Sequence, residues 1–215
     1  ISAEFVENER RSLPPSEFAR ERMGWWENPM GAGEVVPIRA WDDCIDLRSA
    51  VAGVPVVAVD VQNSREWSTI AAGSLRPDGR VHVEIIEANS GTAWIVDRLA
   101  SLETKPSKIL IDATGPAGSL IHEADQRGIE IEAVSPALHA RACGLFYDLA
   151  TTSRLAHLDD PVMRRALLCA TKSDRGDGAW VWSRKDSIGD ISPLVAVTLC
   201  VGAVGVEVDV STQIF

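Results

Sequence analysis

The clearest hydrophobic pattern along the chain begins at Val54. Val54–Asp60 (VPVVAVD) is a continuous apolar run of strand length that ends in an acid. A run without polar alternation is typical of a central strand that is covered on both faces. Trp67–Leu75 and Arg80–Ala88 are predicted as the next two strands, and the Pro-Asp-Gly turn signal at 77–79 predicts an antiparallel hairpin between them.

Helices and strands then alternate. Ser90 is expected to cap a helix that runs to about Leu102. The later segments are bounded by turn formers, by proline at helix starts and by short apolar strands. They are a strand at Lys108–Asp112, a helix from Gly115-Pro116 to about Arg127, a strand at Ile129–Val134, a helix from Pro136 to about Thr151, a helix near Pro161–Ala170, a hairpin or loop at Lys172–Trp180 overlapping a Trp-rich strand at Ala179–Ser183, and a final helix from about Ser192.

The order of three strands followed by two crossover units restricts the topology. Right-handed crossovers place strands one, three, four and five in the same direction. With strand four beside strand one, the prediction is an α/β fold with a mixed five-stranded sheet in the order 3-2-1-4-5. Sites in such sheets form where the carboxyl ends of parallel strands part. Asp60 and Asp112 each close one of those strands.

These two aspartates are the first candidates for chemistry. Each by itself has an ordinary explanation, because an aspartate after a strand often caps the next turn. Two carboxylates on neighbouring strand ends repel each other unless a cation neutralises them. Oxygen ligands with no His or Cys nearby in the sequence favour Mg²⁺ or Mn²⁺ over zinc.

A third acid is expected from the element that packs against this end of the sheet. Ser192 and Pro193 suit the N-cap and first position of the final helix, which leaves Asp190 just ahead of it. The core-facing spacing of that helix directs Asp190 inward. Asp190 is alternatively the cap itself, and Asp186 is then the back-up candidate.

Residues 1–50 differ from the rest. A charged helical stretch is predicted at about Ser16–Trp26, followed by turn formers, and Trp25, Trp26 and Trp41 are possible anchors on the domain surface. We interpret residues 1–50 as a linker from an absent upstream domain, and the start at Ile1 indicates a fragment of a longer protein. The stretch lacks the apolar core of a signal peptide, and no apolar run approaches the roughly 20 residues of a membrane span.

Charge and cysteine content limit the possible functions. With 21 basic and 31 acidic residues, the formal net charge is −10. This balance argues against strong intrinsic binding of nucleic acid, and it is compatible both with a cation site and with plain solubilising charge. The four scattered cysteines have no zinc-ligand spacing and are expected to be reduced, buried thiols of a cytosolic protein.

Four segments carry a resemblance to a known family. The strand ending in VAVD at Asp60, the ILID strand at Asp112 and the GDISPLVAVTL segment at Asp190 resemble the nuclease domain of bacteriophage large terminase subunits. The arm SEFARERMGWWENP resembles the segment that joins the ATPase and nuclease domains in terminases of actinobacterial phages. The resemblance implies a ribonuclease-H-like fold over residues 51–215, with Asp60, Asp112 and Asp190 as the metal-binding acids.

The resemblance also implies an activity and partners. It implies a divalent-metal-dependent DNA endonuclease that cuts concatemeric double-stranded viral DNA during packaging. Two Mg²⁺ or Mn²⁺ ions would activate the attacking water and neutralise the leaving 3′ oxygen, with Asp60 bridging both ions. The implied partners are the missing ATPase domain, the phage portal and the small terminase subunit, in the cytoplasm of the infected host. ATP turnover by this chain is not expected, because it has no GxxxxGK[ST] stretch.

DNA contact is the least specified part of this hypothesis. Weak binding of double-stranded DNA is expected, through basic side chains along one side of the cleft. The candidates are Arg141, Arg154, Arg164, Arg165, Arg175, Arg184 and Lys185. His82, His122, His139 and His157 are expected to be structural or exposed, with a helper role open for His157 or Lys185.

Three alternatives remain at this stage. A resolvase-like or transposase-like nuclease would keep the fold and change the substrate. A catalytically silent α/β module would bind a partner or small ligand, and replacing Asp60 would then change only stability. A nucleotide-binding Rossmann-type domain is disfavoured, because no GxGxxG follows the first strand.

Overall fold

The computed structural model describes residues 34–212, and their side chains up to residue 205. The predicted helix at Ser16–Trp26 and the anchors Trp25 and Trp26 lie outside the described residues. From Val35 onward the chain forms one compact unit.

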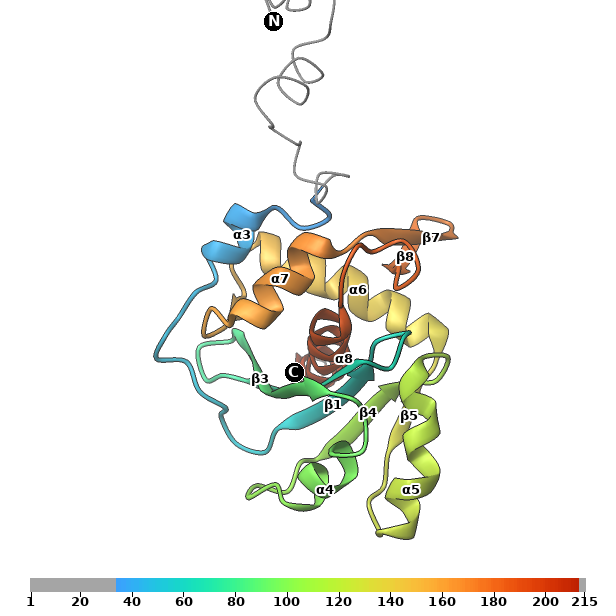
Figure 1. Cartoon of the computed structure of the whole chain (residues 1–215). Coiled ribbons are helices and arrows are strands. Elements are labelled where there is room, and N and C mark those ends of the chain that lie inside the picture. Colours follow the sequence, from blue (N-terminus) through green and yellow to red (C-terminus); the bar gives the residue numbers. More distant parts are fainter. Residues whose placement is uncertain (1–33, 213–215) are drawn as a thin grey trace, which may run out of the picture. The chain divides into compact units, whose positions relative to one another are not determined.

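A six-stranded mixed sheet forms the centre of this unit (Figure 1). Its order is β5-β4-β1-β2-β3-β6, which contains the predicted order 3-2-1-4-5. β1 pairs antiparallel with β2 and β2 with β3, whereas β4 lies parallel to β1 and β5 parallel to β4. The strands are β1 (Val56–Val61), β2 (Trp67–Leu75), β3 (Val81–Ser90), β4 (Lys108–Asp112), β5 (Glu132–Val134) and β6 (Leu155–Ala156).

The sheet differs from the prediction in the number of strands, six instead of five. β6 was not predicted; it has two residues and pairs parallel with the start of β3. A two-residue strand is too short to show a hydrophobic period, so it cannot be predicted from the local sequence. Its pairing depends on the position of the C-terminal end of α6, which precedes it.

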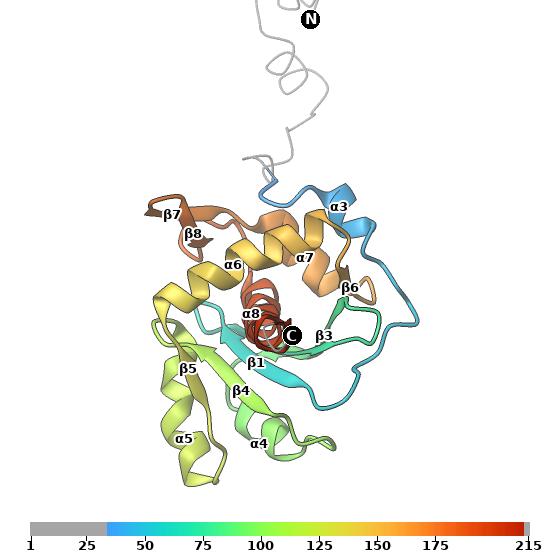
Figure 2. The ribbon, with the colours of Figure 1, turned by 180° about the vertical axis from the view of Figure 1, so that it is seen from behind.

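Helices cover both faces of the sheet (Figure 2). On one face α8 lies against β1, β2 and β3, and α6 packs on α8. On the other face the buried side chains of α4 and η1 meet alternate residues of β1. The helices are α3 (Ile38–Asp42), α4 (Ile95–Ala100), the 3₁₀ helix η1 (Pro116–Leu120), α5 (Ile121–Gln126), α6 (Pro136–Thr151), α7 (Pro161–Cys169) and α8 (Ser192–Thr212).

One helix begins later than predicted, and another predicted helix is divided into two. Ser90 does not cap a helix: it ends β3, where it pairs with Trp67, and α4 begins at Ile95. The hairpin partner therefore keeps β3 extended past the point where local sequence favoured a helix. The helix expected from Gly115-Pro116 to Arg127 is divided into η1 and α5.

α8 is the core helix of the unit. Residues Leu194 to Val201 are all buried, consistent with a helix that is apolar on all sides. It approaches its neighbours closely: a Cβ added at Gly73 of β2 would lie 2.9 Å from Cβ of Cys200, and one at Gly202 would lie 2.5 Å from Cβ of Ala142 in α6. Within the described part of the chain, no helix has both the length and the apolar character needed to cross a membrane.

A separate two-stranded hairpin, β7 (Lys172–Gly176) and β8 (Ala179–Trp182), follows α7. It lies where the sequence predicted a hairpin or loop and a Trp-rich strand. Its base is anchored by Trp182, which is buried and donates its indole N–H to Thr198 Oγ1 of α8 at 2.8 Å. This anchor places the turn after β8 beside the sheet.

Residues 35–50 pack on the same unit. Trp41 of α3 is fully buried and stacks on His157, with ring centroids 3.7 Å apart. His157 Nε2–H donates to the Trp41 carbonyl at 2.9 Å, and His157 Nδ1 accepts from the Asp159 N–H. Burial lowers the pKa of His157, so this histidine is a neutral structural residue, as expected. The assignment of residues 1–50 as an arm of a longer chain stays a prediction.

All four cysteines lie within the described residues, and none of them is in a disulfide. Three are buried and Cys169 is partly exposed. Burial raises the pKa of Cys143 to about 12, so its thiol stays protonated at neutral pH. Three of the four cysteines are thus buried, as predicted, and Cys169 is not.

Candidate functional site

Asp60 and Asp112 lie on the same face of the sheet at neighbouring strand ends. In β1, Val57, Val59 and Val61 point to the α4 side, so Asp60 points to the α8 side. Leu110 of β4 packs into the α8-side core while Ile111 packs on the other side, which gives Asp112 the same orientation. The parallel register pairs Ala58 with Leu110, and the two aspartates lie two residues beyond that pair.

Both carboxylates are almost completely buried, with 0% of Asp60 and 1% of Asp112 exposed. A buried charge requires a partner, and both aspartates share Arg184. Arg184 Nη2 donates to Asp60 Oδ1 at 2.7 Å and Nε to Oδ2 at 3.3 Å, while Nη1 donates to Asp112 Oδ2 at 2.9 Å. One guanidinium therefore bridges the two predicted metal ligands.

Asp112 has further donors around it. Its Oδ1 accepts from the backbone N–H of Thr114 at 3.0 Å and from the Thr114 hydroxyl at 2.9 Å. Nδ1 of His139, from α6, lies 3.3 Å from Asp112 Oδ2. His139 is buried, and its Nε2 has no hydrogen-bond partner among the described residues. His139 was expected to be structural or exposed; instead it lies in the site and contacts Asp112.

The two aspartates titrate in opposite directions. Burial raises the pKa of Asp60 to about 6, because the charge of Arg184 and its hydrogen bonds offset only part of the desolvation. Burial also acts to raise the pKa of Asp112, but the hydrogen bonds from His139 and Thr114 and the charge of Arg184 outweigh it and lower that pKa. For Arg184, burial is outweighed by the two carboxylates, which raise its pKa. At neutral pH two carboxylates thus share one guanidinium.

Asp190 does not take part in the Arg184 contacts that connect Asp60 and Asp112. Its Oδ1 accepts from the N–H of Ser192 at 2.9 Å and its Oδ2 from the Ser192 hydroxyl at 3.0 Å. Both oxygens of Asp190 are therefore engaged with Ser192, the first residue of α8. Ser192 Oγ lies 3.0 Å from Thr69 Oγ1, and Thr69 is the residue opposite Asp60 in β2.

Within residues 34–205, no group of three or more His, Cys, Asp and Glu side chains is arranged as metal ligands. Asp186, the back-up candidate, accepts from the Ser183 hydroxyl at 2.6 Å. The structure thus brings together two of the three predicted acids. Their donor chemistry fits a hard divalent cation, because three carboxylate oxygens, two from Asp60 and one from Asp112, converge on one cationic group.

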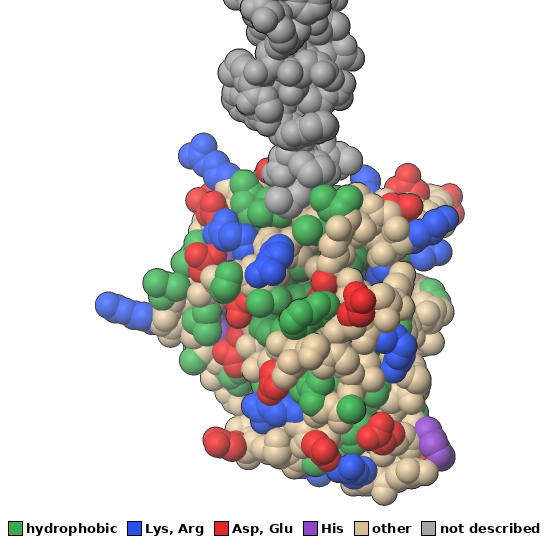
Figure 3. Space-filling model, viewed as in Figure 1, with side chains coloured by type: hydrophobic (Ala, Val, Ile, Leu, Met, Phe, Trp, Pro, Cys, Tyr) green, Lys and Arg blue, Asp and Glu red, His purple; other side chains and the backbone are tan. Residues whose placement is uncertain are grey.

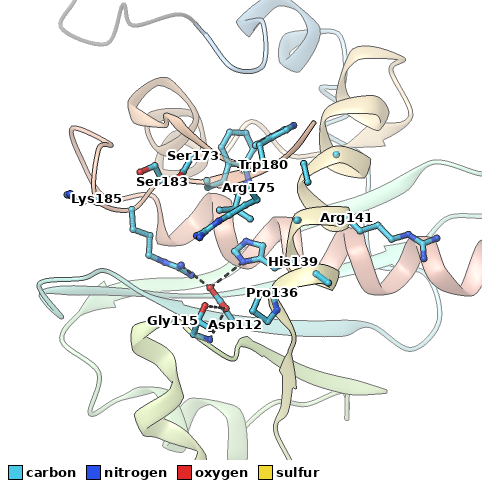
Figure 4. Close-up of a pocket in the computed structure, with 18 of the residues that line it drawn as sticks. Asp112, Gly115, Pro136, His139, Arg141, Ser173, Arg175, Trp180, Ser183 and Lys185 are labelled. Carbon is cyan, nitrogen blue, oxygen red and sulfur yellow. Dashed lines mark hydrogen bonds and ion pairs between the residues drawn. The ribbon is translucent and has the colours of Figure 1, made fainter. Parts of the chain in front are cut away.

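An open cleft of about 1450 Å³ is lined by Asp112 and by Arg184, which connects it to the buried Asp60. Asp112 and His139 line its base, and the β7–β8 hairpin with Arg175 and Lys185 forms the opposite side (Figure 4). Of the seven predicted basic residues, four line the cleft: Arg141, Arg175, Arg184 and Lys185. Arg164 instead pairs with Asp42 and Asp159 on the outside of the unit. Acidic and basic side chains are interspersed on the face seen in Figure 3.

Comparisons with known proteins place this fold. No family model and no curated protein sequence matches the chain. Among solved structures, the large terminase of bacteriophage HK97 is similar with a TM-score of 0.67 and 14% identity, over 94% of this chain and 51% of that one. This chain therefore spans about half the length of the HK97 protein.

Isolated nuclease domains are similar as well. The large terminase nuclease of the thermophilic phage G20c with bound magnesium matches 75% of this chain and 94% of its own, with a TM-score of 0.56 and 15% identity. The large terminase of another thermophilic bacteriophage, in complex with ADP, matches 95% of this chain and 52% of its own, with a TM-score of 0.57 and 14% identity. The predicted ribonuclease-H-like α/β fold class is thereby confirmed.

Proposed function

We propose that this chain is the nuclease domain of a phage DNA-packaging terminase and cuts double-stranded DNA with divalent metal ions. The observation that carries the proposal is the convergence of two buried carboxylates, Asp60 and Asp112, on Arg184, with Asp112 and Arg184 lining an open cleft. Buried, paired carboxylates at parallel strand ends are costly to a fold, and they are typical of sites that hold a cation. The likeness to terminase nucleases, one of them with bound magnesium, supports the same function.

The residues of the chain have distinct parts in this proposal. Asp60 and Asp112 would hold Mg²⁺ or Mn²⁺, and Asp190 would complete the set if its carboxylate turned from Ser192. When bound, a pair of such ions supplies Lewis-acid chemistry to phosphodiester hydrolysis. His139 and Thr114 hold the Asp112 carboxylate in place through their contacts with its two oxygens.

The cleft residues would receive the DNA. Arg175 and Lys185 present cationic groups opposite Asp112, where they can neutralise phosphates on either side of the cut. The net charge of −10 and the mixed surface favour weak binding by this domain alone. Tight binding of a DNA concatemer would come from other parts of the packaging machine. These are the ATPase domain in the remaining half of a terminase chain, the portal and the small subunit.

The test is nicking and linearisation of supercoiled plasmid by the purified chain in Mn²⁺, in Mg²⁺ and in EDTA. Cutting that requires the metal and is lost in a folded Asp60→Asn variant is expected. Asp97→Asn is the matched control, because Asp97 is an exposed acid that pairs with Arg127 on the other side of the sheet. A folded parent that neither cuts DNA nor binds a divalent ion would contradict the proposal.

One observation favours a second function. Arg184 already neutralises the acid pair, as expected of a catalytically silent binding module that has no need of a metal. That alternative predicts that Asp60→Asn changes stability and leaves every other property of the chain as it was.

A further inference from the structure

Arg184 has no part in the function described so far, although it makes three hydrogen bonds with the acid pair. Its side chain is 15% exposed and its two partners are 0% and 2% exposed. Two carboxylates at this depth cannot both stay charged without a cation beside them. In the metal-free domain Arg184 supplies that cation.

Arg184 is carried by a turn. β8 ends at Trp182 and α8 begins at Ser192, and residues 184–186 between them form no helix or strand. The base of the turn is held independently of the acids, because the Ser183 N–H donates to the Thr171 carbonyl at 2.8 Å. Rotation of side-chain torsions is therefore enough to withdraw the guanidinium, and neither the sheet nor α8 has to move.

A withdrawn Arg184 side chain would have room in the cleft. Arg184 lines the cleft, as do Arg175 and Lys185, so a withdrawn guanidinium remains in the volume where DNA phosphates are expected. Arginine forms forked hydrogen bonds with phosphate as readily as with carboxylate. The same group can thus exchange one anionic partner for another.

A divalent cation and the guanidinium require the same oxygens. Both Oδ atoms of Asp60 and Oδ2 of Asp112 accept hydrogen bonds from Arg184, so all three oxygens converge on the guanidinium. The guanidinium already occupies these oxygens, and its charge repels an approaching metal ion at low dielectric, so a metal ion can bind them only after Arg184 leaves. We propose that Arg184 is a resident counter-ion that divalent metal must displace, so that it weakens metal binding until DNA offers the guanidinium a phosphate. This inference rests on the proposed nuclease function.

The experiment measures Mn²⁺ affinity directly, by electron paramagnetic resonance of free Mn²⁺ without DNA. The parent is compared with Arg184→Gln, with Asp60→Asn, which defines the site, and with Arg76→Gln as a matched control. Arg76 also bridges two carboxylates, of Asp46 and Asp78, and is 19% exposed. We expect Arg184→Gln to bind Mn²⁺ at least about tenfold more tightly than the parent, and Arg76→Gln to match the parent.

The outcomes separate this inference from the proposed function. If the parent shows Asp60-dependent binding and Arg184→Gln binds Mn²⁺ equally or more weakly, the counter-ion role is refuted and the nuclease proposal stands. If neither the parent nor folded Arg184→Gln binds Mn²⁺ more tightly than Asp60→Asn, the metal site itself is refuted, and the proposed function with it.

A second measurement covers the case in which Arg184→Gln does not fold. Arginine modification by phenylglyoxal in the parent, read by mass spectrometry, compares Arg184 with Arg76 in Mn²⁺ and in EDTA. Arg184 is expected to become more reactive in Mn²⁺ while Arg76 does not change. Equal protection of Arg184 under both conditions, at a Mn²⁺ concentration that fills the site, would overturn the inference.

Discussion

Replacing Asp60 by asparagine is expected to stabilise the metal-free domain at neutral pH. Asp60 is fully buried, and its pKa of about 6 shows that Arg184 does not offset the whole desolvation of its charge. Asparagine has the same shape, carries no charge, and its carboxamide oxygen can still accept a hydrogen bond from Arg184. The substitution would then remove a proposed cation ligand at a gain in stability.

The magnitude follows from the pKa. The rise from 3.8 to about 6 is about two pH units, and at about 1.4 kcal/mol per unit the ionised carboxylate costs the fold about 3 kcal/mol. The buried amide retains part of this cost, so we expect a gain of about 1–3 kcal/mol. Because the folded-state pKa is raised, the folded protein binds the proton more tightly. The parent is therefore relatively most stable at low pH and loses stability as the pH rises through 6.

Urea unfolding in EDTA, followed by the fluorescence of the buried Trp41 and Trp182, measures this effect. The difference in unfolding free energy between Asp60→Asn and the parent should be roughly half developed at pH 5 and complete near pH 8. Asp97→Asn, an exposed acid on α4, serves as the control and should differ from the parent by no more than about 0.5 kcal/mol at any pH. An Asp60→Asn protein less stable than the parent at pH 8, or a difference independent of pH, would refute the reasoning.

The other predictions concern neighbouring features. Asp112→Asn should lower the unfolding free energy at pH 7.5 by roughly 1–3 kcal/mol, because its pKa is lowered by the groups that bind its charged form; urea unfolding measures the loss. Burial lowers the pKa of His157, so the unfolding free energy should fall as the pH drops below about 6.5. In His157→Gln, urea unfolding over the same pH range should show no such loss from this residue. Gly202→Ala should cost roughly 1–3 kcal/mol in the same assay because its Cβ would meet Ala142, whereas Gly118→Ala, with open space around it, should not.

Much of the sheet could be predicted because its signals are local. β2 and β4 have the predicted bounds, and β1 begins only two residues after the predicted start. The strand order followed from connection rules rather than from residue pairs, since a meander and two right-handed crossovers leave little choice. Where tertiary pairing decides the outcome, as for Ser90 at the end of β3, local propensity pointed to the wrong element.

The candidate site was predictable only where it rests on strands. Asp60 and Asp112 could be placed together because strand parity and register follow from the sheet. Asp190 precedes a helix, and its carboxylate is oriented by hydrogen bonds from the N–H and hydroxyl of Ser192, which no spacing rule determines.

Arg184 and His139 reach the site from elements whose packing is not encoded locally. Arg184 was one of seven basic candidates, and its contact with Asp60 spans 124 positions. A signal for His139 existed, since Pro136 starts a helix directly after β5, which places the first turn at the carboxyl edge of the sheet. It is a weak signal, because a histidine on a helix face is more often structural.

The most direct test of the central claim is anomalous diffraction from crystals of this chain soaked in Mn²⁺. The account predicts a manganese peak bound by the carboxylates of Asp60 and Asp112, with the Arg184 guanidinium withdrawn into the cleft. A soaked crystal that shows Arg184 still bridging the two acids, with manganese elsewhere or absent, would contradict it.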